Sequence, residues 1–378
     1  MNSDTTQWAD LASRSLGAGV IYANDELFAD RENLIKPEDP VFQPHTFGNK
    51  GQIMDGWETR RRRQEAGNGH SDSAIVRLGV AGVVRRVVVD TSYFTGNYPP
   101  EVSVEACGAE GYPAPAELAA AQWTTVVPRS AVAGDARNEF DVTLSTTGEQ
   151  RFTHVRLTIF PDGGVARLRV YGEPVPDPRL LPATIDLAAL ENGAVVTGCS
   201  NMFYSSPANL LMPGLARVMG DGWETARRRD QSNDWVAVRL ACAGAVEVVE
   251  LDTSHFVGNA PGWAALGYDG GDLMARTALQ PDTRHRFAVP GGPVAEQVRL
   301  DVYPDGGMAR LRVFGTPTPQ ARTALAERFL RLLPAPQLAA LLRAAGLPAG
   351  EAVRRAQARA ALADLPPAAR GSFRLGPE

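Results

Sequence analysis

The 378-residue chain has an ordinary globular composition, with 44% hydrophobic residues and a formal net charge of −5. The negative charge argues against general binding to nucleic acid or to an anionic membrane. No apolar run reaches the roughly 18 residues that a membrane-crossing helix needs, and the N-terminal sequence MNSDTTQWADLASRS lacks the features of a secretory signal. Cys107, Cys199 and Cys242 show no paired spacing, which is typical of a reducing compartment. We therefore expect a soluble cytoplasmic protein.

Three sequence blocks occur twice and in the same order, which indicates a tandem duplication. The first block differs between its copies only where Arg60 becomes Ala226, and the loops of the second copy are shorter. The blocks are DGWETRRRR (55–63) and DGWETARRR (221–229), DTSYFTGN (90–97) and DTSHFVGN (252–259), and PDGGVARLRVYG (161–172) and PDGGMARLRVFG (304–315). The predicted segments are a lead-in (1–16), repeat 1 (17–180), repeat 2 (181–318) and a C-terminal extension (319–378).

Inside each repeat the chain is predicted to form short strands. Segments such as 83–90 and 245–252 are rich in β-branched residues and are bounded by glycine. The PDGG turns join two further strands, and in the second of these Arg167 and Arg169 alternate with apolar residues, so we expect both to face solvent or a neighbouring strand. Neither repeat contains a long 3.6-residue period. The pattern predicts an all-β protein with two tandem jelly-roll β-sandwich domains.

The extension from residue 319 has a different composition, dominated by Ala, Leu and Arg. Its apolar residues carry helical spacing, so that Leu325, Phe329 and Leu332 or Leu333 would share one face. Prolines such as Pro334 break the pattern. We predict a short α-helical C-terminal tail that packs on the β domains or on another subunit.

The carboxylates of the DGWET blocks are the first candidates for chemistry. Glu58 and Glu224 each stand beside a run of arginines, where a carboxylate can serve as a positioned acid or base. They can equally form ion pairs with those arginines. Trp57, after an Asp-Gly turn, is a candidate for substrate contact or for a plug that closes the open end of a sandwich.

The arginine runs favour a small carboxylate ligand, because a guanidinium holds a carboxylate through two parallel hydrogen bonds. Nucleic-acid binding is disfavoured, since it needs more distributed basic charge and stacking aromatics. On a strand, alternate arginines face opposite sides, so that some can pair at the core edge while others reach a cleft. The shared positions are Arg61, Arg62 and Arg63 in repeat 1 and Arg227, Arg228 and Arg229 in repeat 2.

The DTS blocks end a predicted strand in each repeat. Asp90, Thr91 and Asp252 are candidates for ligand contact, or they cap a turn. Asn97 follows a glycine in a loop, where its amide can contact a ligand or stabilise the turn. Both interpretations stay open for all four residues.

The repeats differ around a histidine. His70 and Asp72 could be a base and the residue that orients it, or two metal ligands, whereas a loop histidine is often simply exposed. Lys50 lies in the long loop of repeat 1 and has no counterpart in repeat 2. The chain has no HExxH, P-loop, GxSxG or dinucleotide motif. No cofactor is predicted, and a divalent metal is left as an open alternative.

Together the three blocks resemble those of the allantoicase family, from about Gly17 to Gly315 in both copies. The resemblance implies two related jelly-roll domains of the galactose-binding-like kind, hydrolysis of allantoate to ureidoglycolate and urea, and assembly as a homo-oligomer. The chain departs from the family pattern in two places. It has HSDS (70–73) where members commonly read HDW, and GQIM (51–54) after Lys50 where they commonly read GKWMDGWE.

The resemblance also implies roles for the candidate residues, since allantoate carries one carboxylate and two ureido groups on one carbon. Arg61 or Arg62 would bind the carboxylate, Glu58 or Asp90 would contact a ureido group or transfer a proton, and His70 is a candidate acid/base. The further candidates for substrate binding are Lys50, Trp57, Asp72, Thr91, Asn97, Glu224, Arg228 and Asp252. The alternatives are a non-catalytic tandem jelly-roll protein that binds small ligands, and a hydrolase of a related ureide. His70 and the longer loop favour repeat 1 as the working copy.

Overall fold

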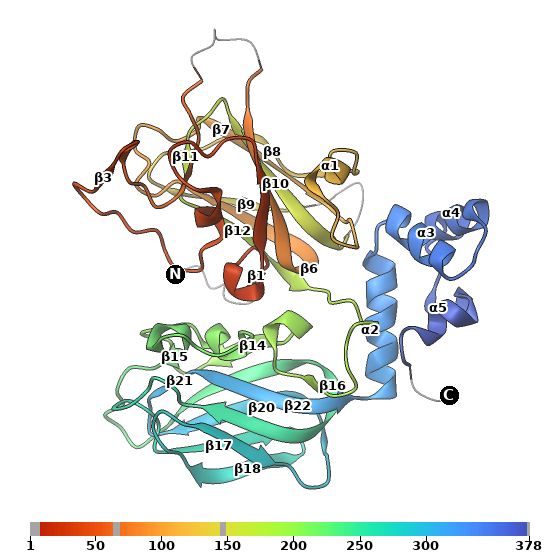
Figure 1. Cartoon of the computed structure of the whole chain (residues 1–378). Helices are drawn as coiled ribbons and strands as arrows, with labels where there is room; N and C mark the ends of the chain where they lie inside the picture. Colours follow the sequence, from red (N-terminus) through yellow and green to blue (C-terminus); the bar gives the residue numbers. More distant parts are fainter. Residues whose placement is uncertain (1–7, 63–68, 144–148, 376–378) are drawn as a thin grey trace.

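The computed structural model describes residues 8–62, 69–143 and 149–375. Two β-sandwiches lie one above the other, and a group of helices stands beside them (Figure 1). Each sandwich contains one eight-stranded sheet with the same strand order, which confirms the predicted all-β fold of the two repeats. Among the described residues, no helix is both long and apolar enough to cross a bilayer.

Repeat 1 is organised around one long strand, β6 (Asp72–Asp90), which takes part in both layers of the sandwich. The first half of β6 pairs with β2 (Gly19–Ala23) and β10 (Phe152–Phe160), and its second half pairs with β9 (Arg137–Asp141) and β12 (Arg167–Pro174). All of these pairings are antiparallel. Because one strand contributes to both layers, the sandwich closes around a single core.

The other strands of repeat 1 extend these layers. Their bounds are β1 (Ala9–Asp10), β3 (Phe47–Gly48), β4 (Gly51–Gln52), β5 (Trp57–Glu58), β7 (Glu101–Cys107), β8 (Thr124–Ala131) and β11 (Gly164–Val165), with the short helix α1 (Pro115–Leu118) before β8. The bend of β6 requires glycine, because a Cβ at Gly82 would lie 2.2 Å from the carbonyl oxygen of Glu173.

Repeat 2 copies this arrangement around the equally long β16. Its strands are β13 (Ile185–Asp186), β14 (Val195–Cys199), β15 (Trp223–Glu224), β16 (Asp234–Asp252), β17 (Trp263–Tyr268), β18 (Gly271–Ala278), β19 (Arg284–Ala288), β20 (Val294–Tyr303), β21 (Gly307–Met308) and β22 (Arg310–Pro317).

The two-residue period of the strands places the core. In β10, Val155, Leu157 and Ile159 are fully buried, whereas Arg156 and Thr158 between them are partly exposed. Each such buried aliphatic side chain stabilises the fold by roughly 1.5–3 kcal/mol. Replacing Leu157 with alanine would leave a cavity and cost about 2–5 kcal/mol.

Arg167 and Arg169 depart from the prediction that they face solvent or a neighbouring strand, because both are buried beneath the 36–55 loop. Arg167 donates to the carbonyl oxygens of Glu38 (3.0 Å) and Asp55 (2.9 Å) and to Asp55 Oδ2 (2.7 Å). Arg169 donates to the carbonyl oxygen of Lys36. The loop carbonyls replace water as hydrogen-bond acceptors, so burial of these guanidinium groups is tolerated. The pair anchors the loop that leads into the DGWE block.

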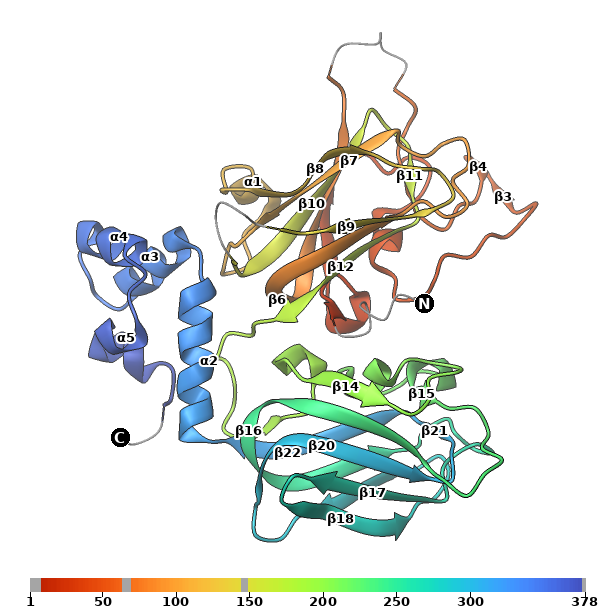
Figure 2. The same ribbon diagram turned by 180° about the vertical axis from the view of Figure 1, so that it is seen from behind.

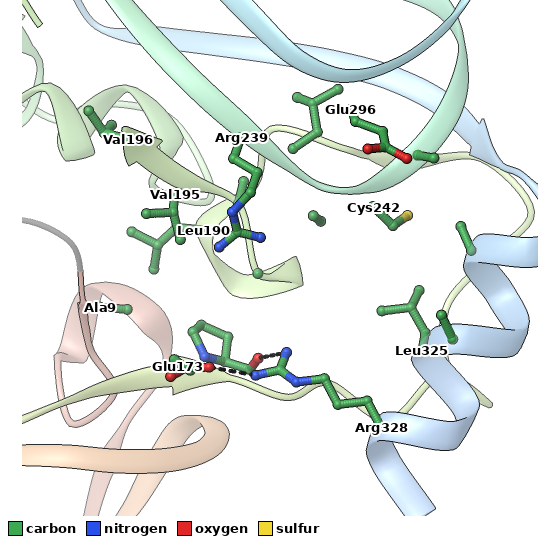
Figure 3. Close-up of a pocket in the computed structure, with 18 of the residues that line it drawn as sticks. Ala9, Glu173, Leu190, Val195, Val196, Arg239, Cys242, Glu296, Leu325 and Arg328 are labelled. Carbon is green, nitrogen blue, oxygen red and sulfur yellow. Dashed lines mark hydrogen bonds and ion pairs between the residues drawn. The ribbon is translucent and has the colours of Figure 1, made fainter. Parts of the chain in front are cut away.

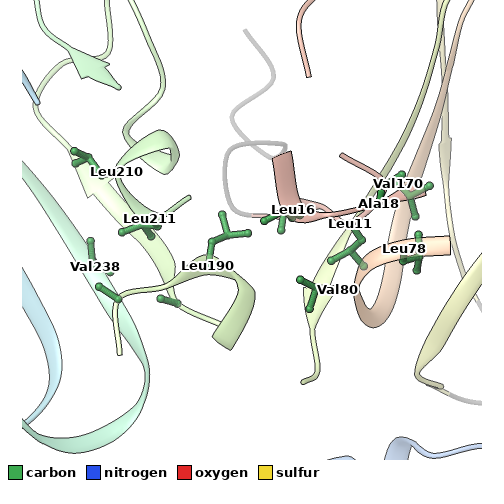
Figure 4. Packing of buried hydrophobic residues seen from close by; sticks show 14 of the residues in the cluster. Leu11, Leu16, Ala18, Leu78, Val80, Val170, Leu190, Leu210, Leu211 and Val238 are labelled. Carbon is green, nitrogen blue, oxygen red and sulfur yellow. The ribbon is translucent and has the colours of Figure 1, made fainter. Parts of the chain in front are cut away.

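The two repeats share a continuous apolar core across their boundary. Leu16 of the first sandwich and Leu190 of the second face each other there, and Leu11 and Leu211 continue the packing on either side (Figure 4). At the periphery, Arg217 of repeat 2 forms an ion pair at 3.0 Å with Glu38 of repeat 1. The loops before the two DGWE blocks therefore touch each other.

The described part of the C-terminal extension forms four α-helices, which agrees with the predicted helical tail. They are α2 (Pro319–Leu332), α3 (Ala335–Ala344), α4 (Ala349–Gln357) and α5 (Pro367–Gly371). Thr318 caps α2 by accepting a hydrogen bond from Ala321 N at 3.1 Å. Figure 2 shows α2 running alongside both sandwiches. Leu332 packs against Val83 and Val175 of repeat 1, so the tail lies on the β domains.

Candidate functional site

The three repeated blocks meet at one end of repeat 1. Glu58 on β5 pairs with Gly164 on β11, and the amide of Gly164 donates to the carbonyl oxygen of Asn97 at 2.7 Å. The ring of Phe94 covers this junction. A Cβ at Gly164 would lie only 2.0 Å from that ring, which explains why glycine is required there. The DGWE, DTS and PDGG blocks thus build one structure.

Repeat 2 builds the same structure from its own copies. Glu224 on β15 pairs with Gly307 on β21, and the amide of Gly307 donates to the carbonyl oxygen of Asn259 at 2.8 Å. Phe256 takes the place of Phe94. The duplication therefore gives two related candidate sites.

A glutamate held by an asparagine is the central feature of each site. Asn97 Nδ2 donates to Glu58 Oε1 at 2.8 Å, and Asn259 Nδ2 donates to Glu224 Oε1 at 2.7 Å. Burial raises the pKa of Glu58, against the opposing effects of the Asn97 hydrogen bond and the Arg61 charge. A carboxyl group whose pKa is raised toward neutrality can both give and take a proton. Glu58 therefore has the environment of an acid/base residue.

The arginine run separates into two environments. Arg62 forms an ion pair with the fully buried Asp72, and its amide donates to Asp162 Oδ2 at 2.6 Å. Arg61 is exposed and makes no hydrogen bond or ion pair with the residues that the structure describes. Arg63 lies outside the described residues. Of the two predicted carboxylate ligands, Arg61 is therefore the one whose guanidinium has no partner in the described part of the chain.

Repeat 2 divides its arginines in the same way. Arg228 Nε donates to the buried Asp234 at 3.0 Å, and the guanidinium also pairs with Asp230 at 3.1 Å. Arg227, the counterpart of Arg61, is exposed. The structure thus gives Arg228 a position within an ion-pair network.

Asp90 is the last residue of β6, and Thr91 begins the turn that follows it. Asp90 accepts a hydrogen bond from Ser92 N at 2.8 Å, and the hydroxyl of the fully buried Thr91 donates to the carbonyl oxygen of Ala133 at 2.6 Å. In repeat 2, Asp252 accepts from Ser254 N at 2.9 Å. These contacts correspond to the turn-capping alternative.

Trp57 has no exposed surface, and its indole nitrogen donates to the carbonyl oxygen of Asp25 at 2.7 Å. A side chain so enclosed cannot reach a ligand. The suggested contact between Trp57 and substrate is therefore corrected to the alternative role of a core plug.

His70 and Asp72 are not brought together as a base and its orienting residue. The Asp72 carboxylate is occupied by Arg62 and by Asn24 Nδ2, which donates at 2.8 Å. His70 is exposed and bonds to no described residue. Lys50 is also exposed, in the turn between β3 and β4, and likewise has no bonded partner in the described part of the chain. Within residues 8–62, 69–143 and 149–375, no three His, Cys, Asp or Glu side chains gather as metal ligands.

Sequence reasoning missed one pair beside the site. Asp25 is buried and forms an ion pair with Arg60, whose amide also donates to Asp25 Oδ1 at 2.8 Å. Burial alone would raise the pKa of Asp25, but hydrogen bonds from the Leu27 and Arg60 amides and the Arg60 side chain lower it overall. In repeat 2 both charges are absent. Asn201 stands in place of Asp25 and accepts from the amide of Ala226, which stands in place of Arg60, at 3.0 Å. The single difference between the DGWET blocks was the signal that could have revealed this pair.

Two copies of one β-sandwich, each with an asparagine-held glutamate at the same end, define a duplicated β-sandwich protein with two related sites. The family model described as "Allantoicase repeat" matches residues 9–175, 185–268 and 269–318. The chain belongs to the allantoicase family, which confirms the resemblance seen in the repeated blocks.

Individual relatives agree with this assignment. The chain is 58% identical over 320 residues to a probable allantoicase of Nocardia farcinica, covering 82% of this chain and 94% of that protein. It is 50% identical over 343 residues to a probable allantoicase of Streptomyces coelicolor, covering 86% and 90%. The crystal structure of allantoicase from Saccharomyces cerevisiae matches with a TM-score of 0.72 at 34% identity, covering 83% of this chain and 94% of that one.

Proposed function

We propose that this protein hydrolyses allantoate to ureidoglycolate and urea. Membership of the allantoicase family over both repeats supports this activity. The observation that carries the proposal at the level of the site is the partly buried Glu58, which is held by Asn97 and lies close to Arg61, a guanidinium without a partner among the described residues. An acid/base carboxyl group beside a free guanidinium suits a substrate that has a carboxylate and a nitrogen leaving group.

The reaction breaks the bond between the central carbon of allantoate and one ureido nitrogen, and adds water across it. In the proposed mechanism Arg61 holds the substrate carboxylate through two parallel hydrogen bonds. Protonated Glu58 gives its proton to the leaving ureido nitrogen, so that urea departs as a neutral molecule. The resulting Glu58 carboxylate then takes a proton from the water whose oxygen bonds to the central carbon. Asn97 keeps the carboxyl group oriented through both steps.

Repeat 1 is the proposed working copy. It alone has the long 36–55 loop and the Asp25–Arg60 pair, which fix the chain on both sides of Glu58. Repeat 2 keeps the Glu224–Asn259 contact, and its role as a second site or as a scaffold is tested by matched substitutions in the two repeats.

Urea release from allantoate by the purified protein, measured before and after exhaustive chelation, tests the activity. Release supports the proposal, and its absence would contradict it. Loss of release on chelation, with recovery on adding a divalent metal, would show a metal requirement and return His70 to the list of candidate ligands. We also expect a homo-oligomer located in the cytoplasm. Sedimentation equilibrium and cell fractionation measure these two properties.

A further inference from the structure

A cleft of about 700 Å³ lies between the two repeats and helix α2 (Figure 3). It is lined by the end of β12, by the short helix η4 (Leu190–Asn192), by β14, by the bend of β16 and by α2. The residues of the DGWE, DTS and PDGG turns take no part in it, so the cleft is separate from both candidate sites. Its size and its position between domains are typical of a small-molecule site.

Arg239 supplies an unpaired positive charge to this cleft. Its counterpart in repeat 1 is Arg77, which donates to the carbonyl oxygen of Gly17 at 2.9 Å and lies 5.9 Å from the ring centroid of Tyr112. Arg239 is exposed and makes no hydrogen bond or ion pair with any described residue, and its guanidinium points into the cleft (Figure 3). Among the described residues, Arg239 therefore has no counterparts of the contacts that hold Arg77 in repeat 1.

Glu296 supplies a charge of the opposite sign. This exposed residue of β20 also lines the cleft, and it too is unpaired among the residues that the structure describes. Arg239 and Glu296 do not form an ion pair with each other. By contrast, the two other charged residues of the cleft are paired, because Glu173 accepts from Arg328 at 2.9 Å and also from Arg85 at 2.8 Å. One cation and one anion are therefore left to face the space.

Much of the remaining lining of the cleft is apolar. Leu190, Val195, Val196 and Leu325 contribute side chains to it (Figure 3). Cys242 also lines the cleft, and burial raises the pKa of its thiol to about 11, so it is neutral at physiological pH. A ligand that fits this lining has an uncharged middle and two polar ends.

We propose that the cleft binds a small acid that carries a carboxylate at one end and an N–H-bearing group at the other, as in an ω-amino acid or a ureido acid. Arg239 holds the carboxylate through two parallel hydrogen bonds, and Glu296 accepts from the amino or ureido group. A ligand bound there touches both repeats and α2, so it fixes their relative positions. This proposal does not depend on the hydrolysis of allantoate.

Calorimetric titration of the full chain with 4-aminobutanoate and with N-carbamoyl-β-alanine tests the proposal and separates the amino and ureido classes. We expect at least one of them to bind. Arg239→Gln and Glu296→Gln should each weaken that binding at least about tenfold. Arg77→Gln is the matched control in repeat 1 and should leave it unchanged. Butanoate and butylamine, which each carry one of the two ends, should bind more weakly.

Filling the cleft gives a second test that leaves both charges in place. Ala324 is an exposed residue of α2 that lines the space, and Ala324→Trp should abolish binding while circular dichroism stays that of the parent. The proposal is overturned if neither probe binds the parent chain, or if binding persists in Arg239→Gln. Equal affinity for butanoate and 4-aminobutanoate would overturn the role of Glu296.

Discussion

Asn97 donates a hydrogen bond from its side-chain amide to the Glu58 carboxylate at 2.8 Å, and this contact joins two of the three repeated blocks. The amide favours the charged form of Glu58, whereas burial favours the neutral form. The balance sets the pH at which the residue changes from acid to base. Asn259 and Glu224 repeat the contact at 2.7 Å in the second sandwich.

Removing the amide should therefore move the pH dependence of activity. In Asn97→Ala the carboxylate loses a donor, so the pKa of Glu58 rises further. Because the first step needs protonated Glu58, the alkaline limb of kcat/KM shifts to higher pH. The pH profile of urea release measures the shift. Asn259→Ala is the matched control, and we expect its profile to follow that of the parent protein. An unshifted alkaline limb in Asn97→Ala would mean that the limb does not report Glu58.

Asp55 should make stability depend on acid pH. Hydrogen bonds from Arg167, Lys36 and the Val41 amide outweigh the effect of burial and lower the pKa of Asp55 from 3.8 to about 2. The contribution of Asp55 to the free energy of unfolding is therefore fully present above its unfolded pKa, and it is lost as pH falls from about 4 to about 2. With allowance for solvent screening, Asp55→Asn should cost about 1–2 kcal/mol at pH 7.

Urea denaturation at pH 7 and at pH 2 measures this contribution. The difference in unfolding free energy between Asp55→Asn and the parent should shrink at the lower pH. Asp221→Asn, at the matching position of repeat 2, provides the comparison. A difference that stays constant from pH 7 to pH 2 would contradict the assignment.

The charge pair Asp25–Arg60 should behave as one unit. Arg60→Ala leaves the buried carboxylate of Asp25 without its cation and should lower the free energy of unfolding by about 1–3 kcal/mol. Adding Asp25→Asn should recover most of the lost stability, because repeat 2 uses the neutral combination of Asn201 and Ala226 at the same place. A double-mutant cycle by chemical denaturation measures the coupling. Strictly additive effects would show that the two side chains do not interact.

Much of the architecture could be predicted from the sequence because the chain is duplicated. A block that returns intact after a change in loop length marks residues that a common structure requires, and Glu58 with Asn97 is such a case. The apolar alternation of the strands predicted the two-layer core, as in β10 with Val155 and Leu157.

Burial by loops could not be predicted in this way. The two-residue period tells which side of a strand a residue occupies, and it does not tell which distant segment covers that side. Arg167 is buried because the 36–55 loop folds over it and supplies carbonyl acceptors. His70 and Asp72 are close in sequence, yet Asp72 turns inward to Arg62 at the start of β6 while His70 stays exposed before it.

The most direct test of the proposed mechanism is the turnover of Glu58→Gln. Glutamine keeps the shape and can still meet Asn97, but it cannot give or take a proton, so kcat for urea release should fall at least about 100-fold. Because burial raises the pKa of Glu58, the folded state bears a cost for its charged form above the unfolded pKa. The variant should therefore be at least as stable as the parent at pH 7, and Glu224→Gln should keep most of the activity. A Glu58→Gln protein with the kcat of the parent would contradict the mechanism.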